Sequence, residues 1–254
     1  EQREQVMRGP PQPSPPPGSY KPAAQLAVFE DVMQVLRAAL LRLYQGAVYL
    51  ELSSSGFGGQ SNSAASVTQV LVGEDAKHYA GYSLSALGDV DEDGYDDFLV
   101  GASGYSSSTG GGGAAYLVWG SEMAGGTASL ADVSLVLEGE MVGDSVSSSL
   151  ARVGDVDRDG LPDFLVGASS VDTDHPDGGQ AYLMLGSDVS PSSASMSLGR
   201  ASYIFSAADS HELAGSDVSG GDFDGDGFSD LVVGAPSAGR NKPYRGHSYV
   251  LFAQ

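Results

Sequence analysis

Three acidic loops of one pattern, D-x-D-x-D-G-x-x-D, constrain the fold of this chain more than any other feature. They span residues 89–97, 155–163 and 222–230, so their starts lie 66 and 67 residues apart. Repetition at such a period indicates an array of similar supersecondary units, each packed on its neighbours. The chain is therefore expected to fold as stacked repeats, with one acidic loop in each of three units.

The spacing of the loop carboxylates suits a calcium ion. Ca²⁺ takes about six to eight oxygen ligands at about 2.3–2.6 Å, and a short loop supplies them when alternate side chains point inward. Positions 1, 3, 5 and 9 provide carboxylates, Gly at position 6 permits the sharp turn, and position 7 offers its backbone carbonyl. The expected metal ligands are Asp89, Asp91, Asp93, Tyr95 and Asp97; Asp155, Asp157, Asp159, Leu161 and Asp163; and Asp222, Asp224, Asp226, Phe228 and Asp230.

The residues after each loop distinguish it from an EF-hand, which needs a bidentate Glu at position 12 and a helix on either side. Position 12 here is Val100, Val166 or Val233. Each loop is followed instead by a short apolar run and Gly-Ala, which is typical of a buried strand. Each loop is therefore expected to lie in a strand–loop–strand hairpin.

Two other interpretations of the loops are open. Asp and Gly are common in turns, so one copy alone would fit a solvated acidic turn equally well. Three copies, each with at least four carboxylates, would repel strongly without a cation, which favours a metal. Magnesium fits less well because it prefers an octahedron that keeps several waters. The sequence thus predicts about three Ca²⁺ ions per chain.

Charge and composition exclude some classes of partner. The net charge of −21 argues against nucleic acid and anionic membrane surfaces. The chain has no Cys and no uncharged apolar run long enough to span a membrane. It shows no signal peptide, so a mature form or a fragment is expected. Loops of this kind often suit extracellular calcium levels, from which we expect an extracellular or cell-surface protein.

The first 45 residues differ in character from the rest. Residues 1–20 are rich in proline and are expected to form an extended or disordered tail. Residues 21–45 are expected to form an amphipathic helix, because apolar residues from Leu26 to Leu43 recur at steps of three or four. This helix is expected to pack on the neighbouring domain. A membrane-surface helix is the alternative, although its polar face is only weakly basic.

From residue 46 onward the sequence predicts short strands. A partial unit, 46–73, precedes three repeats over about 74–138, 139–206 and 207–254. The expected strands are 47–52 and 67–72; then about 81–88, 97–102, 113–119 and 133–138; about 147–154, 163–168, 179–185 and 201–206; and about 215–221, 230–234 and 247–253. Four antiparallel strands in each repeat are typical of a propeller blade, so we expect an all-β fold of β-propeller blades.

These residues resemble FG-GAP repeats, the blades of integrin alpha-subunit β-propellers. Gly88–Ala102, Gly154–Ala168 and Gly221–Pro236 are similar to the calcium hairpin of that family, and the third copy carries its Gly-Ala-Pro ending in full. The resemblance covers residues 46–254 and does not extend to 1–45. It implies a closed ring of more blades than this chain has. We therefore expect a partial propeller, completed by a longer protein, by self-association of copies, or by the helix covering an edge.

The resemblance implies a non-catalytic calcium-binding module for adhesion or ligand binding, with an unidentified extracellular protein or glycan as partner. The alternatives are an accessory propeller of a secreted enzyme, such as a phospholipase D-like hydrolase, and a carbohydrate-binding propeller. The sequence offers little for catalysis, since its histidines form no H-E-x-x-H motif and no G-x-S-x-G elbow is present. The histidines are His78, His175, His211 and His247. We therefore expect no enzymatic activity in the propeller itself.

Overall fold

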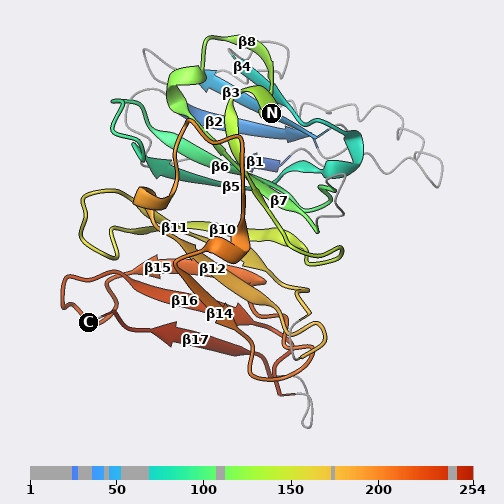
Figure 1. The fold of residues 1–254 in the computed structure, drawn as a ribbon, viewed down its shortest axis with the longest axis vertical. Coiled ribbons are helices and arrows are strands. Elements are labelled where there is room, and N and C mark those ends of the chain that lie inside the picture. The colour runs from blue at the N-terminus through green and yellow to red at the C-terminus, as the bar shows by residue number, and fades with distance from the viewer. Residues whose placement is uncertain are drawn as a thin grey trace, which may run out of the picture.

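The computed structural model describes residues 25–27, 36–42, 46–52, 69–106, 112–172, 175–239 and 245–253. In these residues the regular structure is β-strand and short 3-10 helix, arranged in four sheets. The sheets follow one another in chain order along the longest axis of the molecule (Figure 1). The all-β prediction is confirmed. The proline-rich tail expected over residues 1–20 lies outside the described residues.

Each sheet corresponds to one blade. The strand orders are β1-β2-β3-β4-β8, β13-β9-β7-β6-β5, β10-β11-β12-β14 and β15-β16-β17. The strands are β1 (Gln25–Ala27), β2 (Leu36–Arg42), β3 (Ala47–Leu52), β4 (Gln69–Val72), β5 (Ala80–Gly88), β6 (Asp97–Ala102), β7 (Ala114–Val118), β8 (Gly126–Ser129), β9 (Ser134–Glu138), β10 (Val146–Gly154), β11 (Asp163–Ala168), β12 (Gln180–Met184), β13 (Ser195–Ser197), β14 (Tyr203–Ser206), β15 (Asp217–Gly221), β16 (Asp230–Ala235) and β17 (His247–Leu251). The 3-10 helices are η1 (Ala76–His78), η2 (Gly120–Glu122), η3 (Leu130–Asp132), η4 (Gly186–Asp188) and η5 (Leu198–Arg200). Within the blades, consecutive strands pair antiparallel, as expected for a propeller.

The first strands of the last three blades, β5, β10 and β15, lie side by side. Hydrogen bonds from serine side chains join them. Ser83 Oγ donates to the carbonyl oxygen of Ser147 at 2.8 Å, and Ser149 Oγ donates to Asp217 Oδ1 at 3.1 Å. The blades are therefore stacked through their first strands, which gives the arrangement of a partial propeller.

The hydrophobic core lies between the blades, because the second strands of the two middle blades, β6 and β11, are buried on both faces. In β6, Phe98 and Val100 pack towards the first blade, whereas Leu99 packs towards the third. In β11, Phe164 packs towards the second blade and Leu165 towards the fourth. This two-sided burial explains why the residues after the first and second acidic loops form an unbroken apolar run.

Two short strands cross from one blade to the next. β8 lies in the connection between the third and fourth strands of the second blade, and it pairs in parallel with β4 of the first blade. β13 occupies the same connection in the third blade and pairs in parallel with β9 of the second. A 3-10 helix follows each strand and buries one leucine, Leu130 or Leu198, at 0% exposure. Each of these crossings extends the outer edge of the preceding sheet.

The helix expected over residues 21–45 is wrong where the structure describes that segment. Gln25–Ala27 and Leu36–Arg42 are the strands β1 and β2, and the remaining positions lie outside the described residues. β2 pairs antiparallel with β3, with Leu41 opposite Val48. An unpaired edge of β3 would leave backbone groups without partners, and strand pairing here outweighs the local helical pattern. The partial unit of two strands thus becomes a sheet that includes β1 and β2. The described residues contain no helix long and apolar enough to cross a bilayer.

Candidate metal centres

The three acidic loops lie at equivalent places in three successive blades. They join β5 to β6, β10 to β11 and β15 to β16, so each loop lies in the hairpin that the sequence predicted. At position 6 the backbone is left-handed, with φ of 92° at Gly94, 98° at Gly160 and 87° at Gly227. A side chain strains this conformation, which explains the glycine in the pattern.

Each loop brings three of its carboxylates together. The groups are Asp89, Asp91 and Asp97; Asp155, Asp157 and Asp163; and Asp222, Asp224 and Asp230. In each group one oxygen of every carboxylate lies within 4.8 Å of the others. Oxygen ligands that surround one Ca²⁺ at about 2.3–2.6 Å lie at most about 5 Å apart. Positions 1, 3 and 9 of each loop can therefore contact a single ion of that size.

The carboxylate at position 5 lies outside these groups. Asp93 Oδ1 accepts a hydrogen bond from the backbone N–H of Tyr95 at 2.8 Å. The equivalent bonds run from Leu161 to Asp159 and from Phe228 to Asp226. One oxygen of position 5 therefore shapes the turn. Metal binding by this carboxylate, and by the carbonyl oxygen of position 7, stays a prediction.

The carboxylate at position 9 is the buried anchor of each loop. Asp97, which is 1% exposed, accepts one hydrogen bond from the N–H of Val90 and one from the N–H of Gly120, both at 2.8 Å. The equivalent donors are Val156 and Gly186 for Asp163, and Phe223 and Ala253 for Asp230. The second donor follows the third strand of the blade and lies 23 residues further along the chain. Position 9 thus joins the loop to the end of the third strand of the same sheet.

The loop pattern does not predict the donors at the end of the third strand. A signal for two of them exists, because Gly120 and Gly186 each follow a strand with the same Ala-Tyr-Leu start. The hydrogen-bond role of these residues needs the sheet register, which places Phe98 opposite Val118 and so brings Asp97 beside Gly120.

Burial changes the proton affinity of the grouped carboxylates. It raises the pKa of Asp97 to about 7, although the N–H groups of Gly120 and Val90 oppose the rise, while the charges of Asp91 and Asp93 add to it. Burial also raises the pKa of Asp163 and of Asp91, and the charge of Asp93 is the next cause at Asp91. A cation among these groups would favour their ionised forms. The all-oxygen donor set therefore suits a hard cation in chemistry as well as in geometry.

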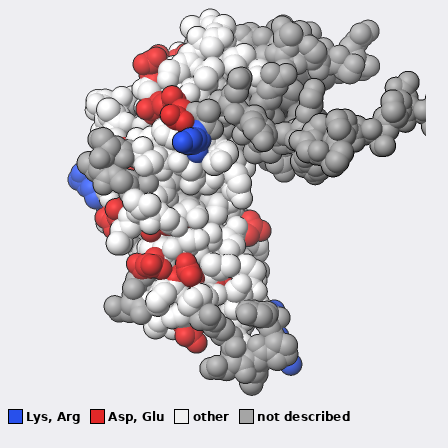
Figure 2. Space-filling view, turned by 90° about the vertical axis from the view of Figure 1, so that its right-hand side faces the viewer, with Lys and Arg blue, Asp and Glu red and all other residues white. Residues whose placement is uncertain are grey.

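The surface around the blades is acidic. On the face drawn in Figure 2, Asp and Glu side chains gather in several patches, whereas Lys and Arg side chains are fewer and scattered. The whole chain has 33 acidic and 12 basic residues. Such a surface raises the local concentration of cations, including those that reach the loops.

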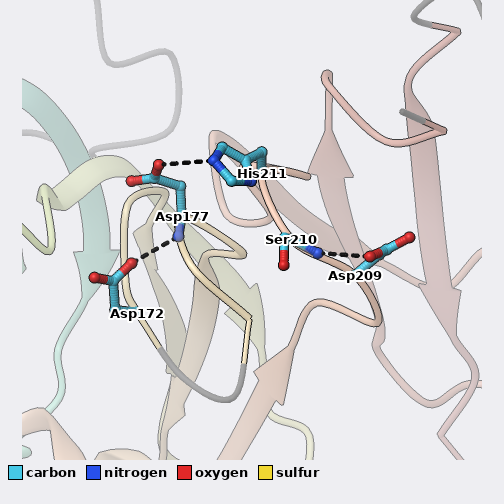
Figure 3. Close-up of polar contacts among 5 residues, drawn as sticks. All are labelled: Asp172, Asp177, Asp209, Ser210 and His211. Carbon is cyan, nitrogen blue, oxygen red and sulfur yellow. Dashed lines mark hydrogen bonds and ion pairs between the residues drawn. The ribbon is translucent and has the colours of Figure 1, made fainter. Parts of the chain in front are cut away.

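The loop between β11 and β12 is a turn that touches the fourth blade (Figure 3). The N–H of Asp177 donates to Asp172 Oδ1 at 2.6 Å, and the N–H of Gly178 donates to the carbonyl oxygen of His175 at 3.1 Å. Asp177 Oδ2 lies 3.5 Å from Nε2 of His211 in the connection that precedes β15. Within the part of the chain that the structure describes, these residues are outside the carboxylate groups suited to a metal.

Two other histidines pack against tyrosines. The ring of His78 lies 4.8 Å from the ring of Tyr105 between centroids, and the ring of His247 lies 6.1 Å from that of Tyr249. These contacts place both imidazoles beside aromatic side chains of their own repeats, in a packing role.

Comparison with known proteins places the acidic loops in a repeat family. The FG-GAP repeat matches residues 80–118, 148–184 and 214–251. Integrin alpha-PS2 of Drosophila melanogaster is 31% identical over 186 residues, which cover 66% of this chain and 12% of the integrin. Integrin alpha-5 of Xenopus laevis is 30% identical over 193 residues, which cover 70% of this chain and 17% of the integrin.

An enzyme is among the similar proteins as well. Phosphatidylinositol-glycan-specific phospholipase D of Rattus norvegicus is 33% identical over 176 residues, which cover 64% of this chain and 19% of the phospholipase. The chain spans less than a fifth of the length of each of these three relatives. The likeness is therefore to one part of each protein.

Proposed function

We propose that this chain, which carries three FG-GAP repeats, is a non-catalytic β-propeller module that binds calcium and, through its surface loops, an extracellular ligand. The observation that carries the proposal is the same group of three carboxylates in each of three loops. Calcium supplies positive charge at these groups. The chain's own residues supply the rest: Asp at positions 1, 3 and 9 provides oxygen ligands, and the buried Asp at position 9 fixes the loop to its blade.

The binding of a protein ligand rests on the kind of protein that the chain resembles. Two of the relatives are integrin alpha subunits, and the resemblance to integrin blades implies a module for adhesion or ligand binding. The loops at the ends of the blades are held by rigid sheets, which is the usual setting for a binding surface. We therefore propose an extracellular or cell-surface location and an extracellular protein as ligand.

A second candidate function is that of an accessory propeller in a secreted enzyme. The alignment with the rat phospholipase D favours it, because this chain covers only part of that enzyme as well. Under this proposal the propeller would position the enzyme or its substrate, for example by binding a glycan. Binding assays of the chain against glycans and against cell-surface proteins distinguish the two candidates, since the adhesion module should retain protein and the accessory domain should not.

A calcium titration by calorimetry on protein stripped with chelator tests the metal proposal. We expect about three sites per chain, at calcium concentrations that range up to about 10⁻³ M. The variant that carries Asp157→Ala and Asp159→Ala should bind one ion fewer, because it removes two carboxylates from the second loop alone. An absence of binding to the wild-type chain at such concentrations would contradict the proposal.

A further inference from the structure

Arg158 and Phe228 form a contact that bridges the second and third acidic loops. The guanidinium carbon of Arg158 lies 3.2 Å from the centroid of the Phe228 ring. Arg158 is at position 4 of the second loop, and Phe228 is at position 7 of the third. A cation over an aromatic face at this distance is attracted by the electrons of the ring. Side chains of two neighbouring blades are therefore joined between their loops.

The backbone of Arg158 is part of the turn that groups the carboxylates of the second loop. Its φ is 63°, a left-handed conformation that is strained for a residue with a side chain. Asp157 precedes it and Asp159 follows it. The N–H of Asp159 donates to Asp155 Oδ1 at 3.1 Å and to Asp157 Oδ1 at 3.2 Å. A contact that holds Arg158 in place therefore also holds the carboxylates on either side of it.

Phe228 is tied in the same way to the third loop. Its N–H donates to Asp226 Oδ1 at 2.8 Å, and its ring is half-buried. Phe228 also precedes Ser229 and the buried anchor Asp230. A cation held by the third loop would fix this ring beside Arg158.

We infer that the second and third loops bind calcium cooperatively and that the Arg158–Phe228 contact transmits the coupling. This inference rests on the proposed calcium function. A cation in one loop orders its side of the contact, so the other loop loses less conformational freedom when it binds. The coupling is reciprocal, and an exposed cation–π contact limits it to about two- to fivefold in affinity.

The first and second loops serve as the control for the second and third, because they lack such a cation–π pair. Position 4 of the first loop is Glu92, and position 7 of the second is Leu161. A carboxylate and an aliphatic side chain have no cation–π attraction. The affinity of the second loop should therefore depend on the third loop and not on the first.

A calcium titration followed by NMR on the full chain resolves the loops one by one. The amide groups of Gly94, Gly160 and Gly227 serve as reporters, because each donates to the carboxylate at position 1 of its own loop, at 2.9, 3.0 and 3.0 Å. Asp224→Ala weakens the third site, and Asp91→Ala is the matched change in the first. We expect Asp224→Ala to raise the calcium midpoint of the Gly160 signal by about two- to fivefold, while Asp91→Ala leaves it unchanged.

Removal of the arginine completes the test. In a chain with Arg158→Ala, the further change Asp224→Ala should no longer move the Gly160 midpoint. If Asp224→Ala in the otherwise wild-type chain leaves the calcium midpoint of the Gly160 signal unchanged, the inference is overturned and the calcium function stands. A wild-type chain in which none of the three glycine signals responds to millimolar calcium overturns the proposed function together with the inference.

Discussion

At the scale of single residues, two carboxylates of one loop have separate tasks. Asp163 is 0% exposed and accepts hydrogen bonds from the N–H groups of Val156 and Gly186, at 2.6 and 2.9 Å. Asp157 is exposed and shares its one backbone partner, the N–H of Asp159, with Asp155. We therefore expect the first side chain to support the fold with or without a metal, whereas the second is proposed as a metal ligand alone.

Asp163→Ala should therefore destabilise the chain even in chelator. It leaves two N–H groups without acceptors: that of Gly186, which is buried, and that of Val156, which is part-buried. The buried group alone should cost about 1–3 kcal/mol. Asp157→Ala should leave stability in chelator nearly unchanged and reduce the stabilisation gained from calcium. Urea unfolding of both variants with chelator and with calcium measures this difference. Equal losses for the two variants in chelator would show that Asp163 is not an anchor.

Acidity should act on the calcium-free chain through Asp97. Its folded pKa of about 7 is above the ordinary value of 3.8, so the fold favours the protonated form. Protonated Asp97 therefore contributes to the free energy of unfolding. This contribution is fully present below the ordinary pKa and is lost as pH rises through about 7. Melting in chelator should thus occur at a higher temperature near pH 5 than near pH 8, and Asp97→Asn should reduce that difference. A calcium-free chain that becomes more stable over the same rise in pH would contradict the assignment.

At the scale of elements, the crossing strands β8 and β13 depend on one leucine each. Leu198 is 0% exposed in η5, directly after β13, and the N–H of Val136 donates to the carbonyl oxygen of Ala194 just before β13. Leu198→Ala should cost about 2–5 kcal/mol and should loosen β13 from β9. Hydrogen exchange at the Val136 amide reports on this pairing. Leu231→Ala, a change of the same kind in the cluster between the third and fourth blades, should leave Val136 protected. Faster exchange at Val136 in both variants would refute a local effect.

The strands that sequence could predict are those whose signal is local. β6 and β11 are apolar runs between an acidic loop and Gly-Ala, and their observed bounds are the predicted ones, 97–102 and 163–168. The sequence did not predict β8 and β13. Both strands are short and lack apolar alternation, and each pairs with a strand of another blade. The segment Leu36–Arg42 is a strand whose leucines also fit a helical spacing, so its pattern favoured the wrong element.

The candidate site was predictable to a similar degree. The loop pattern identified the carboxylates at positions 1, 3 and 9, which the structure groups in all three loops. It did not show that an oxygen of position 5, as in Asp93, accepts the N–H of position 7. It also gave no sign of the contact between Arg158 and Phe228, since the two residues meet only when neighbouring blades stack.

At the scale of the whole molecule, the glycine of the Gly-Ala pair in β11 limits how closely the fourth blade approaches the third. A Cβ on Gly167 would overlap the carbonyl oxygen of Gly215 in the fourth blade. A Cβ on Gly234, the same position in the fourth blade, would meet nothing nearer than the oxygen of Asp217 at 3.3 Å. Gly167 therefore lies at a blade interface, while the nearest atoms to Gly234 belong to its own sheet.

Gly167→Ala should weaken the packing of the fourth blade on the third, and Gly234→Ala should be tolerated with a small shift. Overpacking of this kind typically costs about 1–3 kcal/mol. Limited proteolysis within β15–β17, together with urea unfolding, measures the effect. Similar behaviour of the two variants would mean that the blades can separate slightly without a loss of stability.

The crossing strands also have a consequence for the order in which the chain is made. β4 ends at Val72, but its parallel partner β8 begins only at Gly126. At a synthesis rate of about 5–20 residues per second, the ribosome needs about 3–11 s to supply that partner. The same delay recurs between β9, which ends at Glu138, and β13, which begins at Ser195. The outer edge of each of these sheets is thus unpaired in the nascent chain until the crossing strand has been synthesised. A chaperone that covers strand edges would act during that interval.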